Sequence, residues 1–138
     1  MQSRILIIDD DEVVLATTGA LLQAAGYEVS THVGPFGATS AIAESLPDLV
    51  LVDVEMPGLS GAVLTALVRG KAQFDGIRIY FFSSQDEEGL RASVEESGAD
   101  GYILKGDREE LQRRVAAVLA APSPRTSPDR TVARPRED

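Results

Sequence analysis

The 138-residue sequence contains no cysteine, which excludes disulfide bonds, thiolate metal sites and cysteine nucleophiles. It also lacks a long hydrophobic run, because no segment approaches the roughly 20 apolar residues of a membrane helix. The N-terminal MQSRILII leads directly into acidic residues, so it does not match a cleavable leader. From these absences we expect a cytoplasmic protein that does not partner with a membrane.

Basic residues are scarce: 13 Lys and Arg stand against 22 Asp and Glu, for a net charge of −9. Residues 122–138 hold four Arg against three acids, so residues 1–121 carry about −10. We therefore expect no nucleic-acid partner, since such partners are bound mainly through phosphate contacts. The length fits one domain over 1–121. The Pro-, Arg- and Ser-rich segment 122–138 has almost nothing apolar to bury and is predicted to be a disordered tail.

Short apolar runs rich in β-branched or aromatic residues recur along the chain, with helix-like segments between them. They cover residues 5–8, 27–31, 49–52, 77–82 and 102–104. Strands that alternate with helices form a parallel sheet. Runs such as LVLV and IYFF are apolar at every position, which indicates a sheet covered by helices on both faces. The prediction is an α/β fold of the (βα)5 type, with a doubly wound, five-stranded parallel sheet.

Capping signals predict where three of the helices begin. Ser60 is a suitable N-cap for the third helix. Ser84 with Glu87, and Asp107 with Glu110, match the capping-box pattern and predict the starts of the fourth and fifth helices.

Polar residues follow four of the five predicted strands. Asp9 and Asp10 follow the first run, Asp53 the third, Ser83 the fourth and Lys105 the fifth. In an open parallel sheet, functional groups gather outside the carboxyl ends of the strands, so we expect these side chains to converge. Carboxylate oxygens suit a hard divalent cation such as Mg²⁺, and an ammonium and a hydroxyl can hold an anion. The pattern indicates a site for a cation together with an anion.

The segments IIDDDE, LVDVEMPGLSG, YFFSS and GADGYILKG occur in this order at the ends of the predicted strands. Together they resemble the receiver domain of two-component response regulators, the family that includes the chemotaxis regulator CheY. The resemblance covers about residues 3–120. It implies the flavodoxin-like or CheY-like strand order 2-1-3-4-5.

The resemblance also implies roles for the acidic residues. Asp53 would be the phosphoacceptor, taking a phosphoryl group from a phosphohistidine on a sensor histidine kinase or a phosphotransfer protein. Asp10, with help from Asp9 and Asp53 itself, would hold Mg²⁺, and the main-chain carbonyl of Glu55 would complete the protein's share of the coordination. Residues 11–12 would instead begin the first helix, where negative charge suits the helix dipole.

Three further residues take part in phosphoryl binding and switching if the resemblance holds. Lys105 would pair with the phosphoryl oxygens, and Ser83 would donate a hydrogen bond to them. Tyr102 would then move inward, so that the signal reaches the surface formed by the fourth helix, fifth strand and fifth helix.

Two positions depart from the usual family pattern. In the family that the sequence resembles, the positions of Glu55 and Gln85 influence the lifetime of the acyl phosphate, and the Glu55 carboxylate would repel an incoming phosphoryl group. We expect an altered dephosphorylation rate. Lys105 is followed by Gly106 where most relatives have proline after a cis peptide. A cis bond before a residue other than proline costs about 2.5 to 4 kcal/mol, so we predict a trans Lys105–Gly106 bond.

The leading hypothesis is a stand-alone receiver that catalyses only its own phosphorylation and dephosphorylation, and that signals by contact with a downstream protein. Whether phosphorylation also drives homodimerisation stays open. The alternative is a pseudo-receiver, an interaction module that is not regulated by phosphorylation because Glu55 and Gly106 impair the site. A metal-dependent phosphatase acting on other substrates is disfavoured, because a second acid/base is missing from a DxD arrangement after Asp53, and no P-loop motif occurs.

Overall fold

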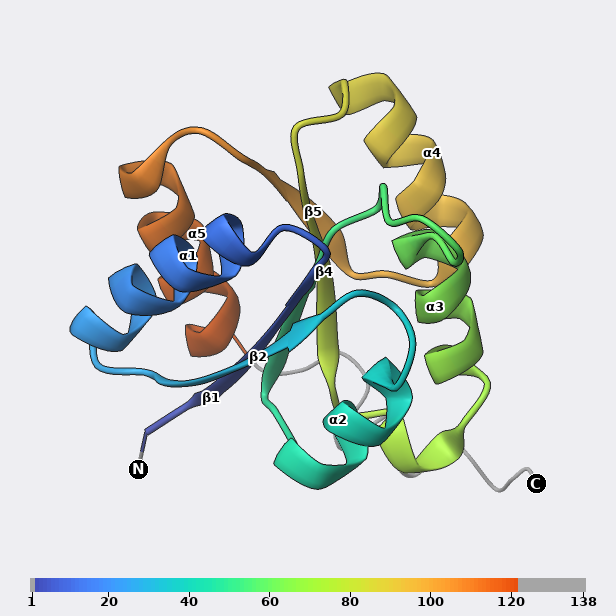
Figure 1. Ribbon diagram of the computed structural model, residues 1–138, viewed down its shortest axis with the longest axis horizontal. Coiled ribbons are helices and arrows are strands. Elements are labelled where there is room, and N and C mark those ends of the chain that lie inside the picture. The colour runs from blue at the N-terminus through green and yellow to red at the C-terminus, as the bar shows by residue number, and fades with distance from the viewer. Residues whose placement is uncertain (1, 122–138) are drawn as a thin grey trace.

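The computed structural model describes residues 2–121, and the predicted tail at 122–138 lies outside the described residues. Strands and helices alternate along this part of the chain (Figure 1). The elements are β1 Arg4–Asp9, α1 Glu12–Ala24, β2 Glu28–Val33, α2 Ala38–Ser45, β3 Leu49–Val52, α3 Gly61–Arg69, the 3₁₀ turn η1 Ala72–Phe74, β4 Arg78–Ser83, α4 Glu87–Ser97, β5 Gly101–Leu104 and α5 Arg108–Ala120. No helix within residues 2–121 combines the length and the apolar character needed to cross a bilayer.

The strands form one sheet in the order β2-β1-β3-β4-β5, and every neighbouring pair is parallel. This confirms the predicted (βα)5 fold and strand order. The order reverses between β1 and β3, whose carboxyl ends lie side by side and carry Asp9 and Asp53. The topology therefore creates the crevice at which α/β sheets of this kind place their functional groups.

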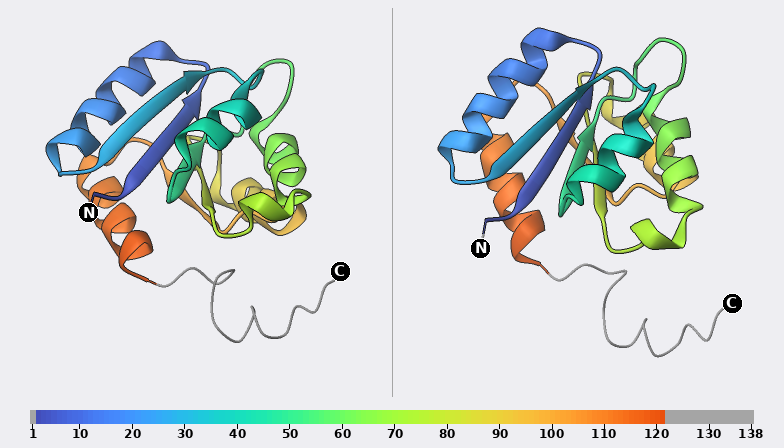
Figure 2. Two further views of the ribbon diagram at one scale, coloured as in Figure 1. Left: turned by 90° about the horizontal axis from the view of Figure 1, so that it is seen from below. Right: turned by 60° about the horizontal axis from the view of Figure 1, so that its bottom comes forward.

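Helices cover both faces of the sheet, as the continuous apolarity of the strands predicts. Helices α1 and α5 lie on one side, and α2, α3 and α4 lie on the other (Figures 1 and 2). Alternate residues along one strand enter the two cores: Leu6 and Ile8 of β1 face α2, α3 and α4, whereas Ile5 and Ile7 face α1 and α5. All four of these side chains are buried.

Most of the predicted helix starts agree with the structure. Ser60 caps α3 by accepting a hydrogen bond from the backbone N–H of Val63, and Asp107 caps α5 by accepting one from Glu110. The predicted cap of α4 is wrong. Asp86, not Ser84, accepts the hydrogen bond at its N-terminus. A carboxylate directly before the helix satisfies the same donors and also suits the helix dipole.

Candidate functional site

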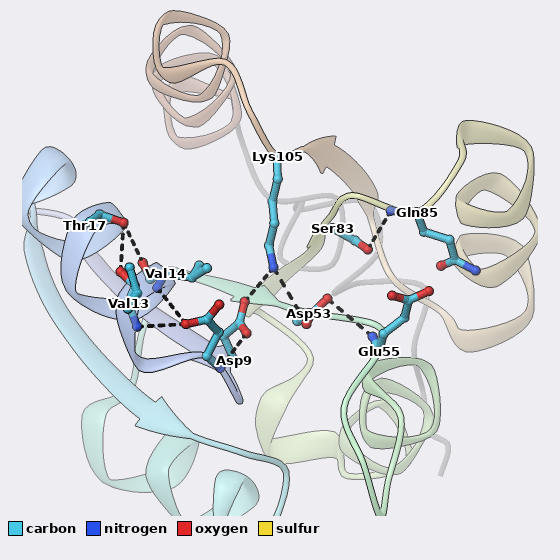
Figure 3. Close-up of polar contacts among 10 residues, drawn as sticks. Asp9, Val13, Val14, Thr17, Asp53, Glu55, Ser83, Gln85 and Lys105 are labelled. Atoms are coloured by element: carbon cyan, nitrogen blue, oxygen red, sulfur yellow. Dashed lines mark hydrogen bonds and ion pairs between the residues drawn. The ribbon is translucent and has the colours of Figure 1, made fainter.

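Three side chains from three strand ends meet at the carboxyl edge of the sheet (Figure 3). The Nζ of Lys105, just after β5, lies 2.9 Å from Oδ2 of Asp9 at the end of β1 and 3.7 Å from Oδ2 of Asp53 after β3. Asp9 is 1% exposed and Asp53 is 7% exposed, so both carboxylates are largely withdrawn from water. Charges in such surroundings need a partner, and Lys105 is shared between them.

Backbone hydrogen bonds hold the two buried carboxylates in place. Asp9 accepts from the N–H of Asp11 at 3.0 Å, and Asp53 accepts from the N–H of Glu55 at 3.3 Å, in both cases through Oδ1. Their Oδ2 atoms are the ones that face Lys105. The N–H of Asp53 also donates to the carbonyl of Ile8, which fixes the two strand ends relative to each other.

Asp10 adds a third acid to this pair. Asp9, Asp10 and Asp53 can each offer one carboxylate oxygen such that the three atoms lie within 4.8 Å of one another. Oxygen donors at this spacing fit a hard cation of the Mg²⁺ class, which retains waters in its remaining positions. Asp10 is exposed, so such an ion would be open to solvent on one side.

The electrostatics of Asp53 reflect this crowding. The pKa of the Asp53 carboxyl is raised from 3.8 to about 6: burial is the largest cause, the negative charge of Asp9 adds to it, and the positive charge of Lys105 opposes both. A cation placed among the three acids would favour the ionised form of Asp53, because opposite charge stabilises a carboxylate. Lys105 alone therefore does not neutralise the negative charge of the acidic cluster.

Asp11 does not belong to this cluster. Its Oδ1 accepts hydrogen bonds from the N–H groups of Val13 and Val14 at 2.9 and 3.4 Å, which makes it the N-cap of α1. Glu12 is the first residue of the helix. The acidic run of the sequence thus divides as predicted, into residues at the strand end and residues at a helix N-terminus.

Comparison with known proteins identifies the family. A family model described as the response regulator receiver domain matches residues 5–116. This chain is a member of the response regulator receiver family. Receiver domains are signalling domains and not classical enzymes.

The receiver is similar to several curated proteins. It is 30% identical to Protein PilG of Pseudomonas aeruginosa over 122 residues, which cover 88% of this chain and 90% of PilG. It is 36% identical to the transcriptional regulatory protein PrrA of Mycobacterium tuberculosis over 118 residues, which cover 84% of this chain but 49% of PrrA. The chain thus spans about half the length of some of the transcriptional regulators that it matches.

Solved structures agree with this assignment. The receiver superposes on a putative response regulator from Chloroflexus aurantiacus with a TM-score of 0.80 and 32% identity, covering 88% of this chain and 100% of that one. The receiver domain of sensor histidine kinase PA1611 from Pseudomonas aeruginosa, solved with a magnesium ion coordinated in its active-site cleft, gives a TM-score of 0.78 at 24% identity, covering 88% of this chain and 100% of that one. At that identity the second likeness concerns the fold alone.

Ser83 lies beside the acids, at the end of β4. It is 1% exposed, and its Oγ accepts a hydrogen bond of 3.1 Å from the N–H of Gln85. The hydroxyl proton can still be donated, since a serine hydroxyl both donates and accepts. Ser83 is therefore tied to the loop that leads into α4 and keeps a donor for the site.

Glu55 and Gln85 border the site on the side of Ser83, and Figure 3 shows their side chains pointing toward one another. Oε1 of Gln85 is buried and is the only buried side-chain acceptor or donor within residues 2–121 that has no hydrogen-bond partner. The two residues that the family resemblance links to phosphoryl lifetime thus lie close together (Figure 3).

The Lys105–Gly106 bond is trans, as predicted, and Gly106 adopts a φ of 112°. Gly106 borders a cavity of about 280 Å³ between α1 and the start of α5, which is also lined by Lys105, Val14 and Leu111. The Nζ of Lys105 nevertheless lies among the acids, so the absence of proline has not turned this side chain away from the receiver's site.

Tyr102 of β5 is only partly buried, and its hydroxyl donates to Oε2 of Glu87 at 2.9 Å. This role of Glu87 was not predicted from the sequence, in which Glu87 matches a capping box. The one feature of the sequence that could have indicated the contact is that Glu87 lies in the first turn of the predicted helix just before the strand that contains Tyr102. A contact between residues 15 positions apart depends on that packing rather than on a local motif.

Proposed function

We propose that this receiver accepts a phosphoryl group on Asp53 from a phosphohistidine of a sensor histidine kinase or a phosphotransfer protein. An Oδ atom of Asp53 attacks the phosphorus, the P–N bond breaks, and its electron pair returns to the histidine nitrogen. The observation that carries this proposal is the convergence of Asp53 with Asp9, Asp10 and Lys105 at one strand edge. Phosphoryl transfer needs mainly positioning and charge neutralisation, which this arrangement can supply.

Each neighbouring residue has a role in the proposal. Asp9, Asp10, Asp53 and the main-chain carbonyl of Glu55 would hold Mg²⁺, which supplies positive charge to the transferred phosphoryl oxygens when bound. Lys105 would exchange part of its contact with Asp9 for a phosphoryl oxygen, and its ammonium carries three donors with which to do so.

The proposed output is a protein contact through the surface of α4, β5 and α5, made in the cytoplasm by a stand-alone receiver. The likeness to PilG, of which this chain covers 90%, supports the stand-alone part of this proposal. Homodimerisation through the same surface upon phosphorylation is a second form that this output could take. Cross-linking with and without beryllofluoride distinguishes dimers from contacts with another protein.

Phosphorylation is tested by incubating the protein with phosphoramidate and Mg²⁺ and measuring its intact mass. We expect one added phosphoryl group on the wild type and none on Asp53→Asn. An unmodified wild type under conditions that label a known receiver would favour the pseudo-receiver alternative.

The metal site is tested with a matched pair of variants. Asp10→Ala should abolish Mg²⁺ binding, whereas Asp11→Ala should keep it and lose about 1 kcal/mol of stability, because Asp11 is a helix cap. Isothermal titration with Mg²⁺ and urea unfolding separate the two effects. Equal Mg²⁺ affinities for the two variants would contradict the assignment of Asp10.

The lifetime of the acyl phosphate is expected to depend on Glu55 and Gln85. Exchanging Glu55 for Asn removes a negative charge beside Asp53 and should change the rate of phosphate loss after the donor is removed. An unchanged half-life would mean that Glu55 has no part in tuning it.

A further inference from the structure

Helix α4 is attached to the rest of the domain by polar contacts at both of its ends, and the two attachments differ in burial. We propose that Arg69 fixes the C-terminal end of α4, while Glu87 is a positioning residue that holds its N-terminal end and Tyr102 in a resting position. On phosphorylation, α4 then pivots about the Arg69 end. The pivot rests on the proposed function, whereas the resting contacts do not.

The C-terminal attachment is a cluster around the Arg69 guanidinium. Its Nε donates to the carbonyl of Gly98, directly after α4, at 3.0 Å, and its NH2 donates to Oδ2 of Asp100 at 2.8 Å and to the carbonyl of Ile77 at 2.9 Å. The same Asp100 oxygen accepts from the N–H of Ile79 at 2.8 Å. The Arg69 and Asp100 side chains are 12% and 9% exposed.

This burial makes the C-terminal attachment difficult to break. A buried, hydrogen-bonded charge pair that loses one partner leaves the other charge uncompensated. Gly98 also has a φ of 88°, and Arg69 passes close to its Cα, so the chain turns sharply there. The cluster joins α3, α4, β4 and β5 at the edge of the sheet opposite the acidic site.

The N-terminal attachment is more exposed and lies next to the site. It is formed by the short segment from Ser83 to Glu87. The Oγ of Ser83 accepts a hydrogen bond from the N–H of Gln85, and Asp86 is the N-cap of α4. Glu87 accepts a hydrogen bond from the hydroxyl of Tyr102. Glu87 itself is exposed to solvent. Hydrogen bonds between exposed side chains contribute little and are readily exchanged for water.

Tyr102 makes two hydrogen bonds, and its ring also packs against the hydrophobic core. Its hydroxyl donates to Glu87, and its carbonyl accepts from NH2 of Arg114 in α5 at 3.0 Å. The second contact involves the backbone and does not restrain the ring. Loss of the Glu87 contact would therefore free the hydroxyl end of the ring to leave its resting position while β5 stays in place.

These contacts couple Ser83 to α4. If Ser83 donates to a phosphoryl oxygen and shifts toward it, the segment from Gln85 to Glu87 follows, and the Glu87 to Tyr102 bond is the contact that lengthens. Because coupling is reciprocal, removal of that bond should favour the state in which the site is occupied.

The resting contact is tested by ¹⁹F NMR of protein labelled with 3-fluorotyrosine, in which Tyr102→Phe assigns the Tyr102 signal. Glu87→Ala should shift that signal, and Glu87→Gln, which keeps an acceptor, should restore it toward the wild-type position. Glu88→Ala is the matched control, because Glu88 is the next residue, is also exposed and carries the same charge. Equal spectra for Glu87→Ala and Glu88→Ala would overturn the role of Glu87, whether or not the protein is phosphorylated.

The pivot is tested with beryllofluoride and Mg²⁺. Glu87→Ala should bind them about two- to fivefold more tightly than Glu88→Ala, since both variants remove one negative charge and only one removes the bond. Hydrogen exchange upon binding should change over residues 87–92 and stay constant over 94–98. Equal affinities, or a uniform change along α4, would overturn the pivot.

Failure of the wild type to bind beryllofluoride would contradict the proposed function and the pivot together, while the ¹⁹F comparison would still decide the resting contact.

Discussion

Replacement of Asp53 with Asn should stabilise the metal-free protein at neutral pH, because the ionised carboxylate opposes folding. Burial is the main cause of its raised pKa, and the negative charge of Asp9 adds to it. The difference between a folded pKa of about 6 and the ordinary 3.8, at about 1.4 kcal/mol per pH unit, corresponds to about 3 kcal/mol. Asn keeps the shape of the side chain without the charge.

The pH range of this effect follows from the direction of the shift. A carboxyl whose pKa is raised in the folded protein makes its full contribution to stability below pH 3.8, where it is protonated in both the folded and the unfolded state. This contribution to the free energy of unfolding is lost as the pH rises through 3.8 to about 6. The stability of Asp53→Asn relative to the wild type should therefore increase by about 2.5 kcal/mol between pH 4 and pH 8.

Urea unfolding in the presence of a chelator, repeated across this pH range, measures the difference directly. The exposed Glu95→Gln serves as the control for the loss of one negative charge. Millimolar Mg²⁺ should reduce or reverse the advantage of Asp53→Asn at pH 8, because a ligand stabilises the protein that binds it more tightly. If the stability difference between Asp53→Asn and the wild type stays constant with pH, the raised pKa of Asp53 is refuted.

Two other substitutions test the surroundings of the site, and a third tests the backbone at the end of α2. Lys105→Met should destabilise the metal-free protein by about 1 to 3 kcal/mol, because it leaves Asp9 buried without its cation, and Mg²⁺ should restore part of the loss in urea unfolding. Gly61→Ala should lower stability and slow phosphorylation by phosphoramidate, because the added Cβ would overlap the main-chain carbonyl of Asp53; wild-type rates would contradict this. Leu46→Gly should raise the thermal stability by about 0.5 to 1 kcal/mol, since Leu46 has a φ of 48° with an exposed side chain, and a lower melting temperature would show that its side chain has a packing role.

The strands of the sheet could be predicted because their determinants are local, whereas their order was predicted only from the resemblance to the receiver family. Residues 49–52 are apolar at every position and are buried on both faces, and the observed strand has the predicted bounds. Strand β2 was harder to place, since most of its residues are exposed at the sheet edge and carry no strong apolar signal. Its observed span of Glu28–Val33 lies one to two residues beyond the predicted 27–31.

The residues of the acidic cluster could also be predicted, because each one directly follows a recognisable strand. The contacts of α4 could not. The cap of α4 was predicted at Ser84 and lies at Asp86, and the bond from Tyr102 to Glu87 depends on how α4 lies against β5. Helix-to-strand packing is decided by side chains distant in sequence, which a single sequence does not pair.

The position of Lys105 bears on the choice between an active receiver and a pseudo-receiver. Without proline at position 106, the aim of Lys105 depends on what holds its backbone and side chain. Its N–H donates to the carbonyl of Ser83 at 2.9 Å, which continues the pairing of β5 with β4, and its Nζ lies 5.7 Å from the ring centroid of Phe82. These contacts precede Gly106 and do not depend on the loop that follows it. Lys105 reaches both Asp9 and Asp53 although the Lys105–Gly106 peptide bond is trans. Glycine in place of proline at position 106 therefore gives no reason to expect an inactive site. The effect of Glu55 is the remaining difference from the family pattern that experiment must decide.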